Sequence, residues 1–265
     1  MLLAIDVGNT NIVFGFLEGE TVMGSFRQVT DYEATQHAMA EDLLPRMALA
    51  GLSSEAVTGV IIASVVPQVI PALKELARET FHQTALVVDE NVDPGLPYEA
   101  EERLGADRAV CCIAAMEKYG KPLVVLDYGT ATTVDALAAD GSYLGGCILA
   151  GIRTSTNALF TGTAQLPQID LQYPPTMLGR DAVTQIQAGS VAGAVGSTEY
   201  LVRKTKEEMG YGMDVKVVAT GGLAHLVAAH TDCIDIVDDD LIVDGLRLIY
   251  ERYRMTEKNQ NEVVI

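Results

Sequence analysis

The feature that most constrains this chain is a short pattern that occurs twice, about half a chain apart. In each copy an apolar run ends in Asp-x-Gly and then small hydroxyl or amide residues, first at 2–11 and again at 123–132. Asp127 follows Asp6 by 121 residues (127 − 6 = 121). Each copy is typical of a buried strand that leads a carboxylate into a tight turn. An ordinary strand with a glycine turn explains either copy alone, but the repetition favours two facing turns that form a nucleotide-phosphate site.

Length and hydrophobicity predict two domains. The chain has 265 residues, of which 49% are hydrophobic, so it can bury a sizeable core. The repeat interval points to the same division. The boundary falls most naturally in the polar segment 117–122, which predicts an N-terminal domain at 1–117 and a C-terminal domain at 118–265.

The charge of the chain limits its partners. A net charge of −18 repels polyanions, so we expect no nucleic-acid partner and no membrane partner. The chain has no Gly-x-x-x-x-Gly-Lys-Ser/Thr loop, so an anionic ligand would need backbone amides, single arginines or bound cations. A divalent metal would then supply much of the neutralisation.

Cysteine usage and the first residues predict a cytoplasmic location. The four cysteines have no metal-binding spacing, and buried free thiols suit a reducing compartment. The N-terminus enters a strand almost at once and does not resemble a signal peptide, and no apolar run reaches about 18 residues.

Hydrophobic periodicity predicts an α/β fold. An antiparallel meander over 1–29 is followed by alternating helices and strands, with helices near 34–50 and 67–80 and strands near 60–66 and 84–88. Pro45 is expected to kink or split the first helix. The second half repeats the plan, with strands in 122–150 and 215–220 and helices near 154–159, 183–208 and 241–254.

Four ordered motifs carry a resemblance to a known family. They are Asp6-Val7-Gly8-Asn9-Thr10, Gly105-Ala106-Asp107-Arg108, Asp127 to Thr133, and Ala219 to Ala224. The duplicated turns resemble the superfamily of acetate kinase, sugar kinases, heat-shock ATPases and actin, and the four motifs together resemble type III pantothenate kinase. The resemblance implies two ribonuclease-H-like domains related by internal duplication, with an ATP cleft between them.

The resemblance also implies a reaction and its cofactors. ATP would phosphorylate pantothenate to 4'-phosphopantothenate, the first step of coenzyme A biosynthesis, in a homodimer that needs Mg²⁺ and either K⁺ or NH₄⁺. It implies that ATP lies along Asp6, Val7, Gly8, Asn9, Thr10, Asn11, Ile12 and Val13, and that it touches Thr130. The same resemblance makes Asp127 the ligand of the monovalent cation, although a second magnesium contact is an alternative for this carboxylate.

Residue chemistry adds roles for two further carboxylates. Asp6 stands at a strand end beside a glycine, where it could hold hydrated magnesium, and a turn-stabilising Asp is the simpler alternative. Asp107 is the candidate general base, and Arg108 could bind an anionic or carbonyl group of the substrate. The small Gly105 and Ala106 leave room for a hydroxy acid beside them. A helix N-terminus with a surface ion pair would explain the same motif.

The remaining substrate residues include one departure from the family. Tyr98 resembles the family's aromatic substrate contact. Ala182 stands where the family usually has a threonine that contacts pantothenate from the partner subunit, so substrate binding is expected to differ here. Ala150 stands where the family often has proline.

Two other functions are compatible with the sequence. A kinase of the same superfamily could act on another small hydroxy compound, because the phosphate turns select ATP and not the acceptor. A non-catalytic ATP-binding regulator would keep both turns without needing a base at Asp107.

Overall fold

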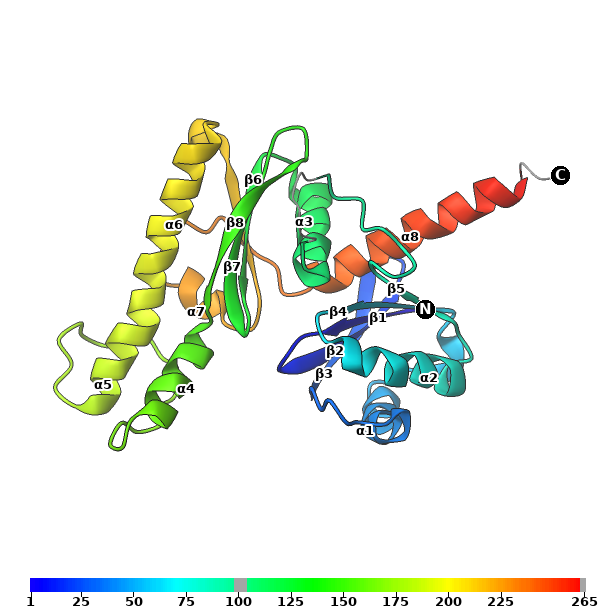
Figure 1. Ribbon diagram of the computed structural model, residues 1–265, viewed down its shortest axis with the longest axis horizontal. Coiled ribbons are helices and arrows are strands. Elements are labelled where there is room, and N and C mark those ends of the chain that lie inside the picture. Colours follow the sequence, from blue (N-terminus) through cyan, green and yellow to red (C-terminus); the bar gives the residue numbers. More distant parts are fainter. Residues whose placement is uncertain (98–103, 263–265) are drawn as a thin grey trace. The chain divides into compact units, whose positions relative to one another are not determined.

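The structure, a computed structural model, describes residues 1–97 and 104–262, with the side chains of 213 and 260–262 left aside. Contacts divide these residues into two units. The first contains residues 1–95 and 104–114 together with the C-terminal helix, and the second contains 96–97 and 115–239. Each unit is built on one five-stranded sheet (Figure 1). These units differ from the predicted division at 117/118, chiefly because the C-terminal helix belongs with the first sheet, and the domain boundary itself stays a prediction.

The first sheet has the strand order β3-β2-β1-β4-β5. The strands are β1 (Leu2–Val7), β2 (Asn11–Glu18), β3 (Thr21–Val29), β4 (Gly59–Ser64) and β5 (Ala85–Val87). The first three form the predicted antiparallel meander, whereas β4 and β5 run parallel to β1.

Helices cover both faces of the first sheet. Helices α1 (Gln36–Leu49) and α2 (Ile70–Thr80) bury Met39, Leu43 and Leu73 against one face. Pro45 lies inside α1, and the helix is not split. On the other face α8 (Leu241–Glu262) contacts β1 and β4, and Val243 packs where any side chain at Gly15 would clash.

The second sheet repeats the first. Its order is β8-β7-β6-β9-β10, which matches the order of the first sheet strand for strand. The strands are β6 (Leu123–Tyr128), β7 (Ala131–Leu137), β8 (Tyr143–Ala150), β9 (Lys216–Thr220) and β10 (Ile236–Val237). Again three antiparallel strands are extended by two parallel ones. This agreement confirms the predicted internal duplication and the α/β fold class.

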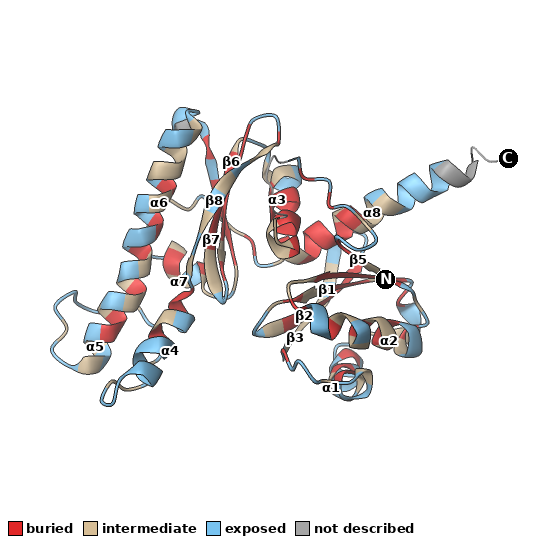
Figure 2. Cartoon of the chain, viewed as in Figure 1, coloured by how far each residue is buried: buried red, intermediate tan, exposed pale blue. Residues whose placement is uncertain are grey.

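The helices of the second unit pack mainly on one face of its sheet. They are α4 (Ile152–Gly162), α5 (Ala182–Gln187), α6 (Gly193–Met209) and α7 (Ala224–Ala228). A π-helical turn at Ala188–Ala192 joins α5 to α6, so the predicted helix over 183–208 exists but changes its winding. Figure 2 shows the central strands as buried, whereas much of α4 and α5 is exposed. Helix α3 (Ala106–Tyr119) completes the fold, and short 3₁₀ turns lie at Ser54–Ala56, Pro67–Val69 and Gly212–Asp214.

Candidate functional site

The first Asp-x-Gly turn joins β1 to β2. Asp6 lies on β1 with its Oδ1 atom buried, and the backbone N–H of Gly8 donates to the carbonyl of Asn11 at 2.9 Å. The side chains of Asn9 and Thr10 are exposed at the tip. The turn therefore presents a carboxylate at its base and polar groups at its tip, as predicted.

Two of the residues predicted to touch ATP have buried side chains. Val7 and Ile12 are 0% and 1% exposed and belong to the hydrophobic core of the first sheet. Their side chains hold the strands together. Any contribution from these two positions to a ligand would come from the backbone.

A segment that sequence reasoning missed holds the carbonyls of this turn. The hydroxyl of Thr30 donates to the carbonyl of Gly8 at 2.7 Å, and the hydroxyl of Tyr32 donates to the carbonyl of Asn9 at 3.2 Å. The backbone N–H of Thr30 donates to the carbonyl of Thr10 at 3.0 Å. Three successive carbonyls are thus bonded to the residues that follow β3. Only the register of the β2–β3 hairpin brings them there, since Asn11 pairs with Val29.

The second turn joins β6 to β7 and is one residue shorter. The N–H of Gly129 donates to the carbonyl of Ala131 at 3.0 Å. The carbonyl of Thr130 accepts two hydrogen bonds, from the N–H of Gly151 at 3.0 Å and from the hydroxyl of Thr154 at 2.6 Å. The start of α4 therefore holds this turn in place.

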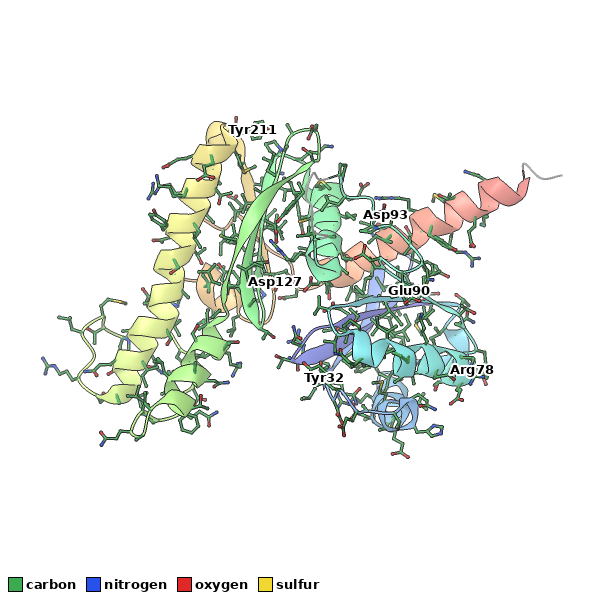
Figure 3. The ribbon with its side chains drawn as sticks, viewed as in Figure 1. Tyr32, Arg78, Glu90, Asp93, Asp127 and Tyr211 are labelled. Carbon is green, nitrogen blue, oxygen red and sulfur yellow. The ribbon has the colours of Figure 1, made fainter. Side chains whose placement is uncertain are left out.

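Asp127 stands at the end of β6, in the second unit (Figure 3). It pairs with Thr133 on one side and with Thr220 on the other, and both threonines are buried. A Cβ atom at Gly221 would lie 2.4 Å from Asp127 Oδ1, so a glycine is required beside this carboxylate. The apolar strand β6 thus ends in a carboxylate that has a glycine and two buried threonines beside it.

Asp107 lies in the first turn of α3. Its Oδ1 atom accepts a hydrogen bond from the N–H of Arg108 at 2.8 Å, and both side chains are partly exposed. A Cβ atom at Gly105 would lie 2.9 Å from Asp107 Oδ1 and 3.9 Å from Val65. Because the N–H of Val65 donates to the carbonyl of Val7 at 3.1 Å, this motif lies at the same end of the first sheet as the Asp6 turn. The structure therefore brings together two of the three predicted carboxylates within one unit.

Within residues 1–97 and 104–262, no group of three or more His, Cys, Asp or Glu side chains is placed to hold a metal ion. Mg²⁺ at phosphate-transfer sites is commonly bound by one or two carboxylates, and water and phosphate oxygens complete the octahedron. A single carboxylate at Asp6 fits that pattern. The carboxylate of Asp127 is likewise an oxygen ligand of the kind that hard cations prefer.

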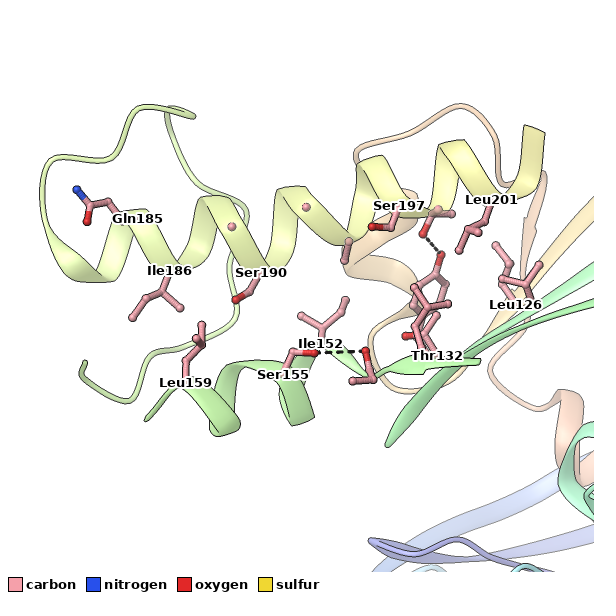
Figure 4. Close-up of a pocket in the computed structure, with 18 of the residues that line it drawn as sticks. Leu126, Thr132, Ile152, Ser155, Leu159, Gln185, Ile186, Ser190, Ser197 and Leu201 are labelled. Carbon is pink, nitrogen blue, oxygen red and sulfur yellow. Dashed lines mark hydrogen bonds between the residues drawn. The ribbon is translucent and has the colours of Figure 1, made fainter. Parts of the chain in front are cut away.

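A separate apolar cavity lies within the second unit (Figure 4). Its volume is 780 Å³, and it is bounded by β6, β7, α4 and the α5–α6 helices. Its floor contains Tyr128, whose hydroxyl is 2.8 Å from that of Thr198. Burial raises the pKa of the Tyr128 phenol well above its usual value. Asp127 does not line this cavity, because alternate side chains of β6 point to opposite faces of the sheet.

Ala182 lies at the first position of α5 and lines one end of the cavity. The preceding Asp181 caps the helix by accepting a hydrogen bond from the N–H of Thr184 at 2.9 Å, and this bond lowers the pKa of the Asp181 carboxyl. Tyr98, the remaining predicted substrate residue, lies outside the described residues.

In the part of the chain that the structure describes, no helix combines the length and apolar character that crossing a membrane requires. The cytoplasmic location stays a prediction.

Comparisons with known proteins agree with this geometry. A family model described as type III pantothenate kinase matches residues 2–204. Type III pantothenate kinases from Brevibacillus brevis and Moorella thermoacetica are each 42% identical over 254 residues, which cover 95% of this chain and 99% of each relative.

Solved structures support the fold. A Baf family protein from Campylobacter jejuni, described as a transcriptional activator, has a TM-score of 0.60 at 19% identity and covers 95% of this chain and 98% of its own. A 2-dehydro-3-deoxygalactonokinase protein from Sinorhizobium meliloti has a TM-score of 0.53 at 13% identity, with coverage of 95% and 96%. At these identities the similarity concerns the fold alone.

Proposed function

The chain belongs to the type III pantothenate kinase family, and we propose that Asp107 is the general base of its reaction. The family reaction is the phosphorylation of pantothenate by ATP, the first step of coenzyme A biosynthesis. The observation that supports this reaction is that the chain aligns with proteins named type III pantothenate kinase over nearly their whole length. It favours pantothenate over another small hydroxy compound, and an enzyme over a non-catalytic ATP-binding regulator.

The Asp6 turn is proposed to bind the phosphates of ATP. Gly8 lets the backbone approach phosphate oxygens closely, and the exposed Asn9 and Thr10 add polar groups at the tip. Asp6 would hold Mg²⁺, through water or directly. When bound, the ion neutralises charge on the phosphates, which is a main requirement of phosphoryl transfer.

Asp107 is proposed to act on the acceptor hydroxyl. Its carboxylate would accept a hydrogen bond from the primary hydroxyl of pantothenate and orient that oxygen in line with the γ-phosphorus. As the new P–O bond forms, the bond to the β–γ bridging oxygen breaks, ADP leaves, and the hydroxyl proton passes to Asp107. Arg108, next in the helix, would bind the carboxylate or a carbonyl of pantothenate through its guanidinium. Support comes from the position of Asp107 at the same end of the sheet as the Asp6 turn.

Asp127 is proposed to bind K⁺ or NH₄⁺, and Thr130 to touch ATP. The residues that surround Asp127 support this role, because Gly221 packs its backbone closely against the carboxylate, where a Cβ atom would lie 2.4 Å from it. Carboxylate, hydroxyl and backbone carbonyl oxygens are sufficient ligands for such an ion. The ion would stabilise the negative charge of a carboxylate that stands at the end of an apolar strand.

A homodimer formed through the second unit is proposed as the assembly. Large apolar side chains are exposed on β8, α4, α6 and the segment around α5, and exposed apolar surface of this kind marks interaction sites. They are Leu144, Ile148, Leu159, Phe160, Met177, Leu178, Val183 and Tyr200. In such a dimer Ala182 would approach the partner's pantothenate, and Tyr98 would contact the substrate within its own subunit. Sedimentation at micromolar concentration tests the dimer.

The test of the base is the Asp107→Asn variant. Asparagine keeps the size of the side chain but cannot take a proton, so kcat should fall by about 10²–10⁴-fold. The affinity for ATP and the melting temperature should change little, since Asp107 is partly exposed at a helix end.

Asp42→Asn serves as the matched control, because it makes the same change in α1 of the first unit, where the carboxylate of Asp42 pairs with Arg46. Its turnover should equal that of the wild type. Near-normal turnover by Asp107→Asn in an ATP-plus-pantothenate assay would rule out the assigned base.

A further inference from the structure

The residues that follow β3 are arranged around the phosphate turn in an unusual way. Thr30 donates two hydrogen bonds to the turn. Its hydroxyl donates to the carbonyl of Gly8 at 2.7 Å, and its backbone N–H donates to the carbonyl of Thr10 at 3.0 Å. Tyr32 reaches the intervening carbonyl, that of Asn9, at 3.2 Å. Nothing in the sequence motif predicts these contacts.

The planarity of the peptide bond gives these contacts a consequence. In a trans peptide the C=O of one residue and the N–H of the next point in opposite directions. Since the carbonyl of Gly8 is directed at Thr30, the N–H of Asn9 points away from Thr30. Since the carbonyl of Asn9 is directed at Tyr32, the N–H of Thr10 points away from Tyr32. The same three bonds also turn carbonyl oxygens, which repel phosphate, towards the protein.

We propose that Thr30 and Tyr32 are positioning residues for ATP, which fix the peptide planes of the turn so that the N–H groups of Asn9 and Thr10 face the phosphates. This inference rests on the proposed binding of ATP phosphates at the Asp6 turn. Successive N–H groups held in one direction form a site for anions. A turn held in this way loses little freedom on binding, which strengthens the interaction with the nucleotide.

The burial of the two residues sets their relative importance. Thr30 is 8% exposed, so the hydrogen bond from its hydroxyl to the carbonyl of Gly8 is shielded from water. Without that hydroxyl, water could not readily donate a hydrogen bond to this carbonyl in its place. Tyr32 is 50% exposed, so water can replace its hydroxyl at Asn9. Loss of the Thr30 hydroxyl should therefore matter more.

The test compares Thr30→Val with Thr30→Ser. Valine matches the shape of threonine but lacks the hydroxyl, whereas serine keeps it. We expect Thr30→Val to raise the Kd for ATP, measured by calorimetry without pantothenate, and the KM for ATP by about tenfold. The KM for pantothenate should not change, and Thr30→Ser should stay within about twofold of the wild type. Tyr32→Phe should raise the Kd for ATP by about threefold.

Thr58→Val is the matched control, because the Thr58 hydroxyl bonds the carbonyl of Met1 at 3.4 Å, at the opposite end of β1 from the phosphate turn. It should leave the Kd for ATP unchanged. The amide proton resonances of Asn9 and Thr10 should shift when ADP is added to the wild type, and should shift less in Thr30→Val.

Several results would overturn the proposal. One is a folded Thr30→Val protein whose Kd for ATP equals that of the wild type. Another is a parallel rise, in Thr30→Val, of the KM for ATP and the KM for pantothenate. A third is a Thr30→Ser protein that binds ATP as weakly as Thr30→Val does. Should Thr30→Val not fold, Tyr32→Phe decides, and an unchanged Kd for ATP in that variant would count against the proposal. Because the nucleotide Kd is measured without turnover, this outcome is independent of whether Asp107 is the base. If Asp6→Asn and Thr30→Val both leave the Kd for ATP unchanged, the proposed phosphate turn itself is wrong.

Discussion

Gly221 offers a test of how closely the backbone must approach Asp127. Its φ is +92°, which L-residues with a side chain rarely adopt, and a Cβ atom there would lie 2.4 Å from Asp127 Oδ1 and 2.6 Å from the backbone nitrogen of Tyr128. Gly221→Ala therefore combines backbone strain with a steric clash. The clash falls on the carboxylate proposed to hold the monovalent cation.

Gly210 separates these two effects. It also has a positive φ, +73°, at the C-cap of α6, but a Cβ atom there would meet no atom within 4 Å. Gly210→Ala should cost only the backbone strain, about 1–2 kcal/mol. Gly221→Ala should cost about 1–3 kcal/mol more, because a well-packed site must accept an extra carbon atom. For a chain of this size that difference lowers the melting temperature by roughly 2–12 °C relative to the control.

The assay measures thermal unfolding and kinase activity for both variants. Gly221→Ala should also need more K⁺ for half-maximal activity, because moving Asp127 weakens the cation site, whereas Gly210→Ala should respond to K⁺ as the wild type does. Equal melting temperatures and equal K⁺ responses in the two variants would refute the argument that close packing against Asp127 matters.

Three further predictions also concern the second unit. Ala182→Thr should lower the KM for pantothenate by about 2–10-fold, the value of one neutral hydrogen bond, and an unchanged KM would exclude this contact. Asp127→Asn should abolish the difference in rate between potassium and sodium buffers, and an identical rate of the wild type in both would argue against the cation site. Burial raises the pKa of Tyr128 above its ordinary 10.0. The phenol of the unfolded chain therefore ionises first as pH rises, so the stability that the neutral phenol contributes is complete below pH 10 and is lost above it. Urea unfolding should show wild type exceeding Tyr128→Phe by about 1 kcal/mol at pH 8 and by less above pH 10, and a constant difference would contradict this.

Much of the fold could be predicted from the sequence because the duplication is local. The apolar runs before Asp6 and Asp127 became β1 and β6, and the meander that follows each is set by short turns. The association of α8 with the first sheet could not be predicted in this way. Its apolar face would fit either sheet, and tertiary contacts such as that of Val243 with Gly15 show which one it covers.

Candidate site residues could be predicted from the sequence where neighbouring residues of one motif form the site. Asp107 and Arg108 stand together in one helical turn, and the resemblance of Gly105-Ala106-Asp107-Arg108 to the family singled them out, since the residues alone also fit an ordinary helix N-terminus. The contacts of Thr30 and Tyr32 depend on pairing between strands, and a threonine after a strand carries no signal of its own. Such positioning residues become visible only when the hairpin register is known.

The two copies of the turn share one further hydrogen bond. In each, the residue that follows the third strand donates its N–H to the carbonyl that precedes the second strand. Thr30 donates to Thr10 at 3.0 Å, and Gly151 donates to Thr130 at 3.0 Å. The duplication therefore extends from the strand order to the bonds that hold each turn.

What differs between the copies is the side chain of that residue. Thr30 has a hydroxyl that binds the carbonyl of Gly8, whereas Gly151 has none to offer to Gly129, and a Cβ atom there would lie 2.4 Å from the Gly129 oxygen. In the first copy the carbonyl is turned to the protein, which suits an anion at the opposite side of the turn. In the second copy residue 151 contributes no side-chain donor, and the Gly129 oxygen packs closely against the backbone of Gly151 instead. The residue after the third strand is therefore where the two turns, proposed to bind phosphate and a monovalent cation, differ in how their first carbonyl is held.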